Sequence, residues 1–352
     1  MEIGNVCICG GGSLGSVIAG VLASQGIEVG ILTGRPERWG GRIEVTDPEG
    51  RLFEGSLSRV SSDPAEVIPQ AQAVLFCLPG FMISRELLRI REHVRPGTFV
   101  GSVFSSTGFF FEAMKILDER IPLWGFQRVP FIARVREYGR SAALLGYKSE
   151  YRIAVERASA TERERLRGWV EEALGRPTGL LGHYLEASIT NSNPLLHTSR
   201  LYALFSEWEP GRCYGRNALF YHEWDDRSSE LFIAMDRELF ALIGALPVSP
   251  GFLLPILDYY ESRDAASLTR KLRSIESFRT IASPMKRAGE GWIPDFDSRY
   301  FTEDFTFGLR YIRELARRYG VATPVIDRVY DWGARAILTY GSGPEGPLGD
   351  GL

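Results

Sequence analysis

The stretch Asn5-Val6-Cys7-Ile8-Cys9-Gly10-Gly11-Gly12-Ser13-Leu14-Gly15 decides the fold of the first half of this chain. Its beginning is a short apolar run, which predicts a buried strand, and apolar residues at helical spacing continue from its end to Gln25. Gly10, Gly12 and Gly15 match the pattern G-x-G-x-x-G between these two elements. In this strand-to-helix context the pattern is typical of a turn that binds the pyrophosphate of a dinucleotide.

Each residue of this turn has its own expected role. Gly10 allows the tight turn, Gly12 lets the backbone approach the pyrophosphate, and Gly15 allows the helix to pack closely on the strand. The free N–H groups of the first helical turn, around Ser13 and Leu14, would face the phosphates at the positive end of the helix dipole. A glycine-rich turn that binds no ligand is the alternative.

Short apolar runs alternate with helical stretches through the rest of the first half. Strands are predicted over 28–33, 73–78 and 98–103, helices over 81–93, 109–120 and 161–174, a hairpin around 47–50, and short strands over 134–155. Thr161 and Glu164 are expected to form the capping box of the helix over 161–174. The alternation predicts a Rossmann-type α/β domain, with a parallel sheet covered on both faces by helices, over residues 1–182.

From residue 183 on, helical spacing of apolar residues dominates. Helices are predicted over 185–207, 229–246, 252–262, 265–275, 305–319 and 324–340. A mainly helical, all-α second domain over 183–340 is therefore expected to follow the α/β domain. The remaining residues, 341–352, are rich in glycine and proline and are predicted to be disordered.

Composition narrows the class of protein. The net charge of −3 gives no indication of nucleic-acid or anionic-membrane binding, and no apolar stretch of about 20 residues is present to span a bilayer. The four cysteines form neither a disulfide framework nor a metal-binding pattern. We expect a cytoplasmic protein without a signal peptide or a metal site, and a homodimer is compatible with the sequence.

The end of the second predicted strand bears on the choice of cofactor. A site for NAD usually has an acidic residue there, but this chain has Thr33-Gly34-Arg35. The Arg35 guanidinium could pair with a 2′-phosphate, so the sequence favours NADP over NAD, unless Arg35 is only a solvated loop cation. Pro79 and Thr107 follow later strands and could line the nicotinamide ribose; ordinary turns are the alternative for both.

His197 is one of only four histidines, and it lies in the predicted helical domain. Its imidazole can exchange a proton near neutral pH. Asn193 precedes it by one helical turn and offers an amide on the same face for a substrate carboxylate or carbonyl. Pro194 lies between them and predicts that the helix kinks or begins there. A histidine without a chemical role is the alternative.

The segment 297–304 combines arginine, acidic and aromatic residues just before a long predicted helix. Asp304 is expected to orient the imidazole of His197, and Arg299 is expected to bind a substrate carboxylate. The alternative is that Thr302, Glu303 or Asp304 merely caps the following helix.

Five segments resemble a known family in the same order along the chain. They are Gly10–Gly15, Phe126–Arg134, Asn191–His197, Ser298–Asp304 with Gly308, and Val321–Asp327. Together they resemble the octopine/nopaline (opine) dehydrogenase family over nearly the whole chain except its tail. The family joins a 2-oxo acid to the amine of an amino acid and reduces the imine with NAD(P)H.

The resemblance implies that His197 is a general acid/base paired with Asp304, and that Arg299 lies at the substrate site. Asn191, Asn193 and Gln127 are assigned to the substrate site on the same basis. The chain departs from the family at Thr198, where proline is common, and at the missing acidic residue after the second strand. The acidic segment 221–226 is also unexpected for a loop near the substrate, and either selects a cationic amino donor or caps the next helix.

Two other functions remain open. A ketopantoate-reductase-like or hydroxyacid dehydrogenase would act on a 2-oxo acid alone and would need a catalytic lysine, but none of the four lysines lies in the helix with His197. A non-catalytic NADP-binding sensor would not bring His197, Asn193, Arg299 and Asp304 together.

Overall fold

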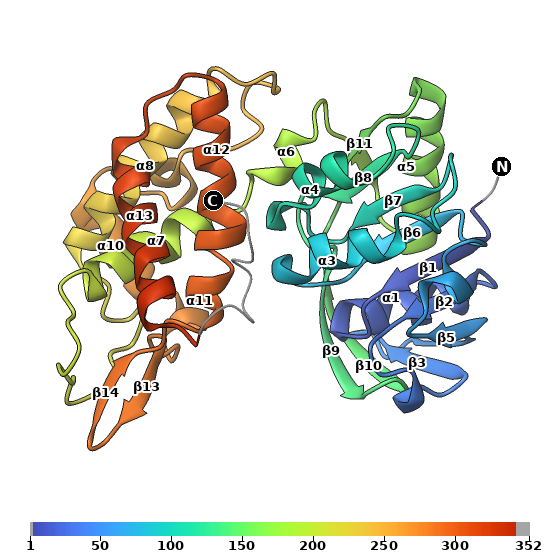
Figure 1. Cartoon of the computed structure of the whole chain (residues 1–352), viewed down its shortest axis with the longest axis horizontal. Coiled ribbons are helices and arrows are strands. Elements are labelled where there is room, and N and C mark those ends of the chain that lie inside the picture. Colours follow the sequence, from blue (N-terminus) through green and yellow to red (C-terminus); the bar gives the residue numbers. More distant parts are fainter. Residues whose placement is uncertain (1–2, 343–352) are drawn as a thin grey trace. The chain divides into compact units, whose positions relative to one another are not determined.

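The computed structural model describes residues 3–342, which form two compact units that divide between Thr190 and Asn191 (Figure 1). The segment 341–352 is predicted to be disordered, and its residues 343–352 lie outside the described residues. Ser342 is described, and its backbone N–H and hydroxyl both donate to the Asp297 carboxylate. Each unit is treated by itself below.

The first unit is built on an eight-stranded sheet with the order β12-β11-β8-β7-β6-β1-β2-β5. All of its neighbouring pairs are parallel except β8 with β11. The strands are β1 (Asn5–Cys9), β2 (Glu28–Leu32), β5 (Arg59–Ser61), β6 (Ala73–Phe76), β7 (Phe99–Ser102), β8 (Leu123–Phe126), β11 (Tyr151–Glu156) and β12 (Thr178–Leu180). The central strands are apolar throughout because both faces of the sheet are covered.

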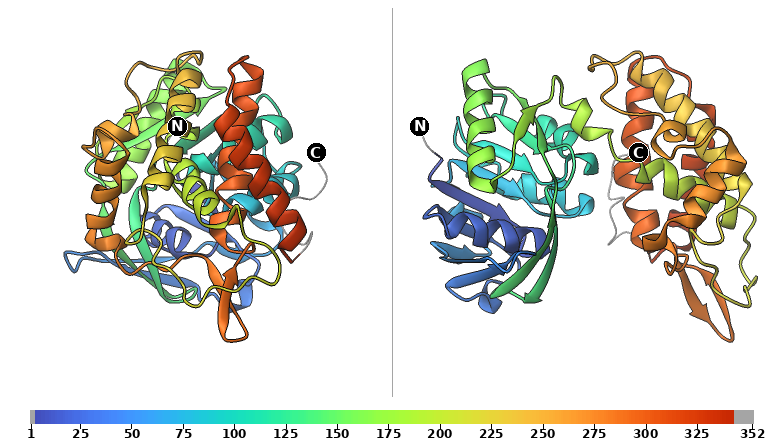
Figure 2. Two further views of the ribbon diagram at one scale, coloured as in Figure 1. Left: turned by 90° about the vertical axis from the view of Figure 1, so that its left-hand side faces the viewer. Right: turned by 180° about the vertical axis from the view of Figure 1, so that it is seen from behind.

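Two hydrophobic clusters flank this sheet (Figures 1 and 2). One contains residues of α1 (Ser13–Ala23) and α5 (Ala160–Leu174), and the other contains residues of α2 (Pro64–Val67), α3 (Gly80–Ile90) and α4 (Phe109–Ile116). The predicted Rossmann-type domain with helices on both faces is confirmed.

A second sheet packs against α1, with the order β4-β3-β10-β9. Its strands are β3 (Arg42–Thr46), β4 (Leu52–Ser56), β9 (Phe131–Glu137) and β10 (Ser141–Tyr147). The antiparallel pairing of β3 with β4 confirms the hairpin predicted around 47–50. The turn between β9 and β10 carries Tyr138, which reaches back to the end of β2.

The expected cap of α5 is wrong by two residues. Ser159, rather than Thr161, is the N-cap, and it forms the capping box with Glu162 instead of Glu164. The sequence contains two overlapping Ser/Thr-x-x-Glu patterns, and apolar spacing does not distinguish between them.

The helix predicted over 185–207 is two helices, α6 (Leu185–Ser188) and α7 (Asn193–Phe205). The Ser106 hydroxyl donates to the Ala187 carbonyl, which ties α6 to the first unit. The structure therefore divides after Thr190, whereas the sequence placed the boundary after residue 182. Pro194 lies in the first turn of α7, so the prediction that a helix begins at this proline is confirmed.

The second unit is mainly helical, as predicted (Figure 2). Besides α7 it contains α8 (Asp226–Ile243), α9 (Ile256–Tyr259), α10 (Ala265–Ser274), α11 (Arg299–Thr302), α12 (Arg310–Arg318) and α13 (Pro324–Tyr340). The helix expected over 252–262 is reduced to the single turn of α9, and the hairpin of β13 (Met285–Ala288) and β14 (Gly291–Pro294) was not predicted.

A π-helical segment, η4 (Phe305–Leu309), precedes α12 where a continuous α-helix was expected. Two glycines let it approach its neighbours closely. A Cβ on Gly308 would lie 2.4 Å from the Pro194 ring of α7, and a Cβ on Gly333 of α13 would lie 2.1 Å from the Phe305 ring. Both contacts leave no room for a methyl group, so η4 is fixed between α7 and α13.

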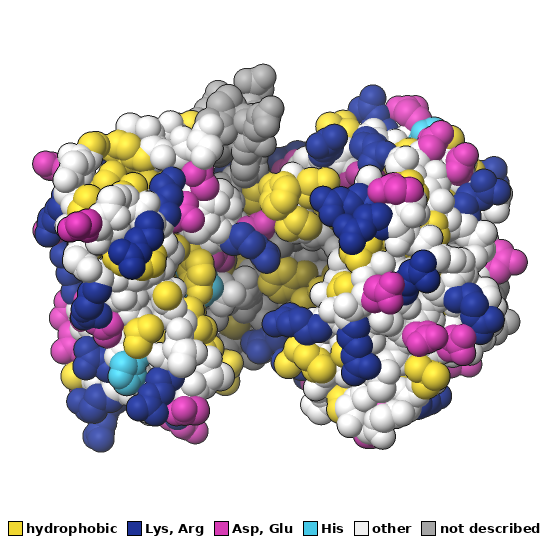
Figure 3. All heavy atoms as spheres, turned by 90° about the horizontal axis from the view of Figure 1, so that it is seen from below, with side chains coloured by type: hydrophobic (Ala, Val, Ile, Leu, Met, Phe, Trp, Pro, Cys, Tyr) yellow, Lys and Arg dark blue, Asp and Glu magenta, His cyan; other side chains and the backbone are white. Residues whose placement is uncertain are grey.

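Among residues 3–342, none of the helices combines the length and the apolar character needed to cross a membrane. On the face that Figure 3 shows, Lys and Arg side chains alternate with Asp and Glu side chains over both units.

Candidate cofactor loop and proton-transfer site

The glycine turn after β1 has the strained geometry expected of it at Gly10 and Gly15. Gly10 has a φ of +115°, and its N–H donates to the Leu32 carbonyl of β2 at 2.9 Å. A Cβ on Gly10 would lie 2.7 Å from the Cys77 carbonyl oxygen, and a Cβ on Gly15 would lie 2.0 Å from the Gly10 carbonyl oxygen. Only glycine fits at these two positions.

Gly12 differs from both, because a Cβ there would meet no atom within 4 Å. Gly12 is the N-cap of α1, and its helix receives no side-chain capping bond. The Ser13 hydroxyl instead accepts from the Val135 N–H at 3.1 Å, and Leu14 is half-buried. The turn therefore offers open space beside uncapped helix N–H groups, which fits the pyrophosphate of a dinucleotide.

The end of β2 carries no carboxylate. Thr33 is buried, and its hydroxyl lies 3.2 Å from the Tyr138 hydroxyl. Arg35 is exposed and its side chain has no hydrogen bond or ion pair within residues 3–342, whereas the Arg38 guanidinium lies 4.9 Å from the centre of the Tyr138 ring. Of these two cations after β2, Arg38 is therefore engaged with an aromatic ring, whereas the Arg35 side chain has no partner among the described residues.

Tyr138 was not predicted to lie near the cofactor loop. Its hydroxyl lies 2.8 Å from the place where Gly11 would carry a Cβ, and its ring contacts Trp39 edge-on at 5.9 Å. The turn between β9 and β10 gives no motif from which this approach could be predicted.

The other two predicted cofactor residues are at the expected edge of the sheet. Pro79 is the N-cap of α3 just after β6, and Thr107 ends a short 3-10 helix after β7. Gln127 follows β8, and its amide N–H group donates to the Glu186 carbonyl and the Thr190 hydroxyl, each at 3.3 Å. Both hydrogen bonds use the amide nitrogen of Gln127, so the amide oxygen of this side chain can accept a hydrogen bond from a ligand.

His197 lies on α7, and its ring is buried with both nitrogens bonded. Nδ1 lies 2.7 Å from Asp304 Oδ2. Asp304 is the residue before η4, and its side chain makes no capping bond there, so the alternative in which it only caps its own helix does not hold. His197 and Asp304 are each about one-tenth exposed at the side chain, at 11% and 13%. The short distance and the burial favour a strong, charge-assisted hydrogen bond.

The second ring nitrogen contacts a residue that the sequence did not single out. His197 Nε2 lies 2.7 Å from the Tyr221 hydroxyl. Burial raises the pKa of Tyr221 far above its ordinary value, with smaller contributions from neighbouring tyrosines and Asp304. Tyr221 therefore stays protonated and can donate. The Tyr300 ring contacts the His197 ring at a tilt, with 4.6 Å between the ring centres, and burial raises the pKa of Tyr300 as well.

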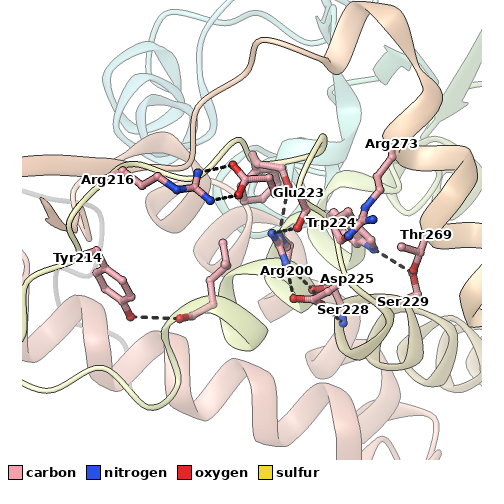
Figure 4. A network of polar contacts seen from close by, with 12 residues as sticks. Arg200, Tyr214, Arg216, Glu223, Trp224, Asp225, Ser228, Ser229, Thr269 and Arg273 are labelled. Carbon is pink, nitrogen blue, oxygen red and sulfur yellow. Dashed lines mark hydrogen bonds and ion pairs between the residues drawn. The ribbon is translucent and has the colours of Figure 1, made fainter.

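Arg200 fixes the loop that carries Tyr221, and Figure 4 shows its contacts with Glu223 and Asp225 of that loop. It is 1% exposed, follows His197 on α7, and donates to the carbonyls of Phe220 and Glu223 on either side of Tyr221. Its guanidinium also pairs with Asp225 at 2.8 Å. Two acidic residues of the segment that seemed unusual in the sequence, Glu223 and Asp225, thus have internal partners, since Glu223 pairs with Arg216.

The predicted substrate-binding residues of this unit are accessible. Asn193 and Arg299 are exposed at the first residues of α7 and α11, and the Asn191 side chain accepts from the Asn193 N–H at 3.1 Å. Arg299 has no ion pair with any described residue. It is next to Tyr300, which contacts the His197 ring, so α11 brings a free guanidinium to the same region.

Two observations bear on other chemistries. No group of three or more His, Cys, Asp and Glu side chains within residues 3–342 is arranged to hold a metal ion. In the second unit, Lys271 pairs with Glu261, and Lys286 lies 3.6 Å from Asp297; both pairs are at the surface.

Residues 180–337 match the family model described as NAD/NADP octopine/nopaline dehydrogenase, alpha-helical domain. Over 94% of its length, and 90% of the relative's, the chain is 27% identical to tauropine dehydrogenase of Arabella iricolor.

Solved structures agree in fold. Octopine dehydrogenase with NADH and L-arginine superposes with a TM-score of 0.79 at 24% identity, covering 95% of this chain and 89% of that one. Yersinopine dehydrogenase with NADP+ bound gives a TM-score of 0.70 at 14% identity, covering 95% of this chain and 90% of that one. The likeness to opine dehydrogenases extends through both units, and the match to the alpha-helical domain of the octopine/nopaline dehydrogenase family covers most of the second unit.

Proposed function

We propose that this protein is an NAD(P)H-dependent opine dehydrogenase, which condenses a 2-oxo acid with the amino group of an amino acid and reduces the product to a secondary amine. The observation that carries the proposal is the buried pair of His197 with Asp304 at 2.7 Å, in a helical domain of this family. Octopine dehydrogenase has been captured with L-arginine and with pyruvate, an amino acid and a 2-oxo acid.

His197 is the proposed general acid/base. Asp304 holds Nδ1, so Nε2, which lies against the neutral Tyr221 hydroxyl, is the nitrogen proposed for proton exchange. The neutral ring takes a proton from the ammonium group of the amino acid, and the freed amine forms a C–N bond to the carbonyl carbon of the oxo acid. The π bond of the carbonyl breaks in this step, and a second proton moves from the nitrogen to the carbonyl oxygen, which becomes a hydroxyl. The imidazolium then returns its proton to the departing hydroxyl, so that the C–O bond breaks and water leaves. Positioned acid/base groups of this kind contribute about 10²–10⁴-fold to rates.

Arg299 and Asn193 are the proposed ligands of the substrate carboxylates, and Asn191 and Gln127 are further proposed substrate-binding residues. Arg299 is exposed at the start of α11 with no ion pair among the described residues, so its guanidinium can bind a carboxylate by donating two parallel hydrogen bonds to it.

The glycine turn with Gly10, Gly12, Ser13, Leu14 and Gly15 would hold the pyrophosphate of the dinucleotide, with Thr33, Arg35, Pro79 and Thr107 around it. When bound, the nicotinamide supplies the hydride that reduces the imine. NADP is favoured over NAD, because the end of β2 offers Arg35 without any carboxylate.

Arg35→Ala is expected to raise the KM for NADPH about 10- to 100-fold and to leave the KM for NADH within about twofold, since only NADPH has the charged 2′-phosphate. Steady-state kinetics with both cofactors measures this. Arg38→Ala is the matched control, because Arg38 is engaged with the Tyr138 ring. Equal losses for both cofactors would contradict a role for Arg35 in reading the 2′-phosphate.

The function itself is tested by following NADPH and NADH oxidation against a panel of 2-oxo acids, each with and without amino acids. Oxidation that requires both partners is expected. Oxidation by a 2-oxo acid alone would instead identify a hydroxyacid dehydrogenase or ketopantoate-reductase-like enzyme, and no oxidation with any pair would favour a non-catalytic NADP-binding protein.

A further inference from the structure

We propose that Tyr221 is a positioning residue for His197: its O–H donates to Nε2 and biases the ring toward its neutral form, with the proton on Nδ1. This inference rests on the proposed function of His197 as acid/base. The inference adds Tyr221 to that site and assigns a donor and an acceptor to each of the two hydrogen bonds of the His197 ring.

The directions follow from the chemistry of the partners. An ionised Asp304 carboxylate can only accept, so Nδ1 carries the hydrogen of the 2.7 Å bond. The Nε2 of the neutral ring then has a lone pair and must accept. Its partner at 2.7 Å is the phenol of Tyr221, which is protonated and therefore able to donate. The imidazole thus has its lone pair on the nitrogen that would take up the substrate proton.

The reverse direction is disfavoured by the surroundings of Tyr221. If Nε2 carried a proton, the Tyr221 oxygen would have to accept and its own O–H would need another partner. Nε2 is the only hydrogen-bond partner of that hydroxyl within residues 3–342. The tyrosine is 4% exposed, and its ring packs against Phe278, with 4.3 Å between ring centres. A buried hydroxyl without an acceptor is costly, so Tyr221 favours the neutral ring.

The loop is built to keep Tyr221 in this place. Arg200 donates to the backbone carbonyls of Phe220 and Glu223, which flank Tyr221 on both sides (Figure 4). Because Arg200 and His197 belong to the same helix, α7 carries both the proposed base and the arginine that fixes the partner of that base.

The charged and titratable groups that face the ring are few. Asp304 approaches from the turn before η4, Tyr221 from the loop before α8, and Tyr300 from α11, while Phe220 closes the remaining side. Asp304 favours the protonated ring and Tyr221 opposes it. Removal of the Tyr221 hydroxyl should therefore move the protonation of His197 in a single direction, toward higher pH.

The test is Tyr221→Phe in the full chain, which removes one oxygen and keeps the ring that packs on Phe278. The imidazoles are labelled with ¹⁵N and titrated by NMR; with four histidines, His197 is identified by the resonance lost in His197→Ala. We expect the His197 titration midpoint to rise by about 0.4–1 pH unit, the equivalent of one hydrogen bond. The ¹⁵N resonance of Nε2 in the neutral ring should also lose the shift that an accepted hydrogen bond causes.

Kinetics provide a second measurement. The acidic limb of the pH profile of kcat/KM is expected to move upward by the same amount in Tyr221→Phe, with kcat near neutral pH reduced about tenfold and the KM for the cofactor unchanged. Tyr300→Phe is the matched control for the midpoint, because Tyr300 contacts the His197 ring only through its own tilted ring and no hydrogen bond joins the two residues.

An unchanged or lowered His197 midpoint in Tyr221→Phe, or an equal shift in Tyr300→Phe, would overturn the inference. The NMR titration does not depend on turnover. If His197→Ala proved fully active, the proposed acid/base role would fail, whereas the midpoint would still decide whether Tyr221 donates to Nε2.

Discussion

His197→Ala is expected to lower kcat for reductive condensation by about a hundredfold or more, with the affinity for NADPH little changed. The substitution removes the only imidazole on α7, together with the proton acceptor held by Asp304. The cofactor-binding residues proposed above all belong to the first unit, so the truncation does not alter them. Turnover is measured under saturating cofactor, and binding by NADPH fluorescence.

Two further variants test whether the expected loss is specific to the pair of His197 with Asp304. His222→Ala is the matched control, because it is the exposed neighbour of Tyr221 and no hydrogen bond joins its ring to His197. It should keep activity near that of the unaltered protein. Asp304→Asn keeps the size of the side chain and removes its charge, and we expect a loss of about tenfold or more because the imidazolium is no longer stabilised. Near-normal turnover of His197→Ala would refute the assignment of the acid/base.

The second large effect is expected at Gly12. Gly12→Ala should weaken cofactor binding by about a hundredfold, while the free energy of unfolding of the free protein stays within about 0.5 kcal/mol of its original value. A Cβ at this position meets no protein atom within 4 Å, and the backbone, with φ of −79°, suits alanine. The added methyl group would therefore clash only with a bound pyrophosphate.

Calorimetric titration with NADPH, together with urea denaturation, separates the two quantities. Gly168→Ala on α5 is the matched control, because its Cβ also enters open space but lies on a helix away from the turn. It should leave cofactor affinity unchanged and stabilise the helix slightly. Undiminished binding by Gly12→Ala would show that the dinucleotide does not pass over this glycine.

Much of the fold could be predicted because its determinants are local. The apolar strand, the glycine spacing and the helix period after residue 183 are each properties of neighbouring residues, and the first α/β unit follows from them. The N-cap of α5 was predicted wrongly because two Ser/Thr-x-x-Glu patterns overlap there, and the length of α9 was predicted wrongly because its apolar periodicity is weak. In both places tertiary packing, rather than local sequence, determines the structure.

The site was predictable only in part. His197 and Asp304 could be associated across 107 residues because an imidazole and a carboxylate suit the same chemistry. Tyr221 and Tyr138 could not, since an aromatic residue in a loop is most often part of a core, and only the folded chain brings these hydroxyls to His197 and to Thr33. Arg200 likewise resembles a surface cation in the sequence and is almost fully buried.

The π-helical turn η4 has a consequence for how such a site is gained or lost. The Leu309 N–H donates to the Asp304 carbonyl, five residues back, so the turn contains one residue more than an α-helix would. Deleting that residue would rotate everything before it by about 100° relative to α12. Asp304 would then face away from His197 although neither side chain had changed. The direction in which the Asp304 carboxylate points therefore depends on the number of residues in η4. Deletion of one codon would break the hydrogen bond between Asp304 and His197, and insertion of one codon would restore it.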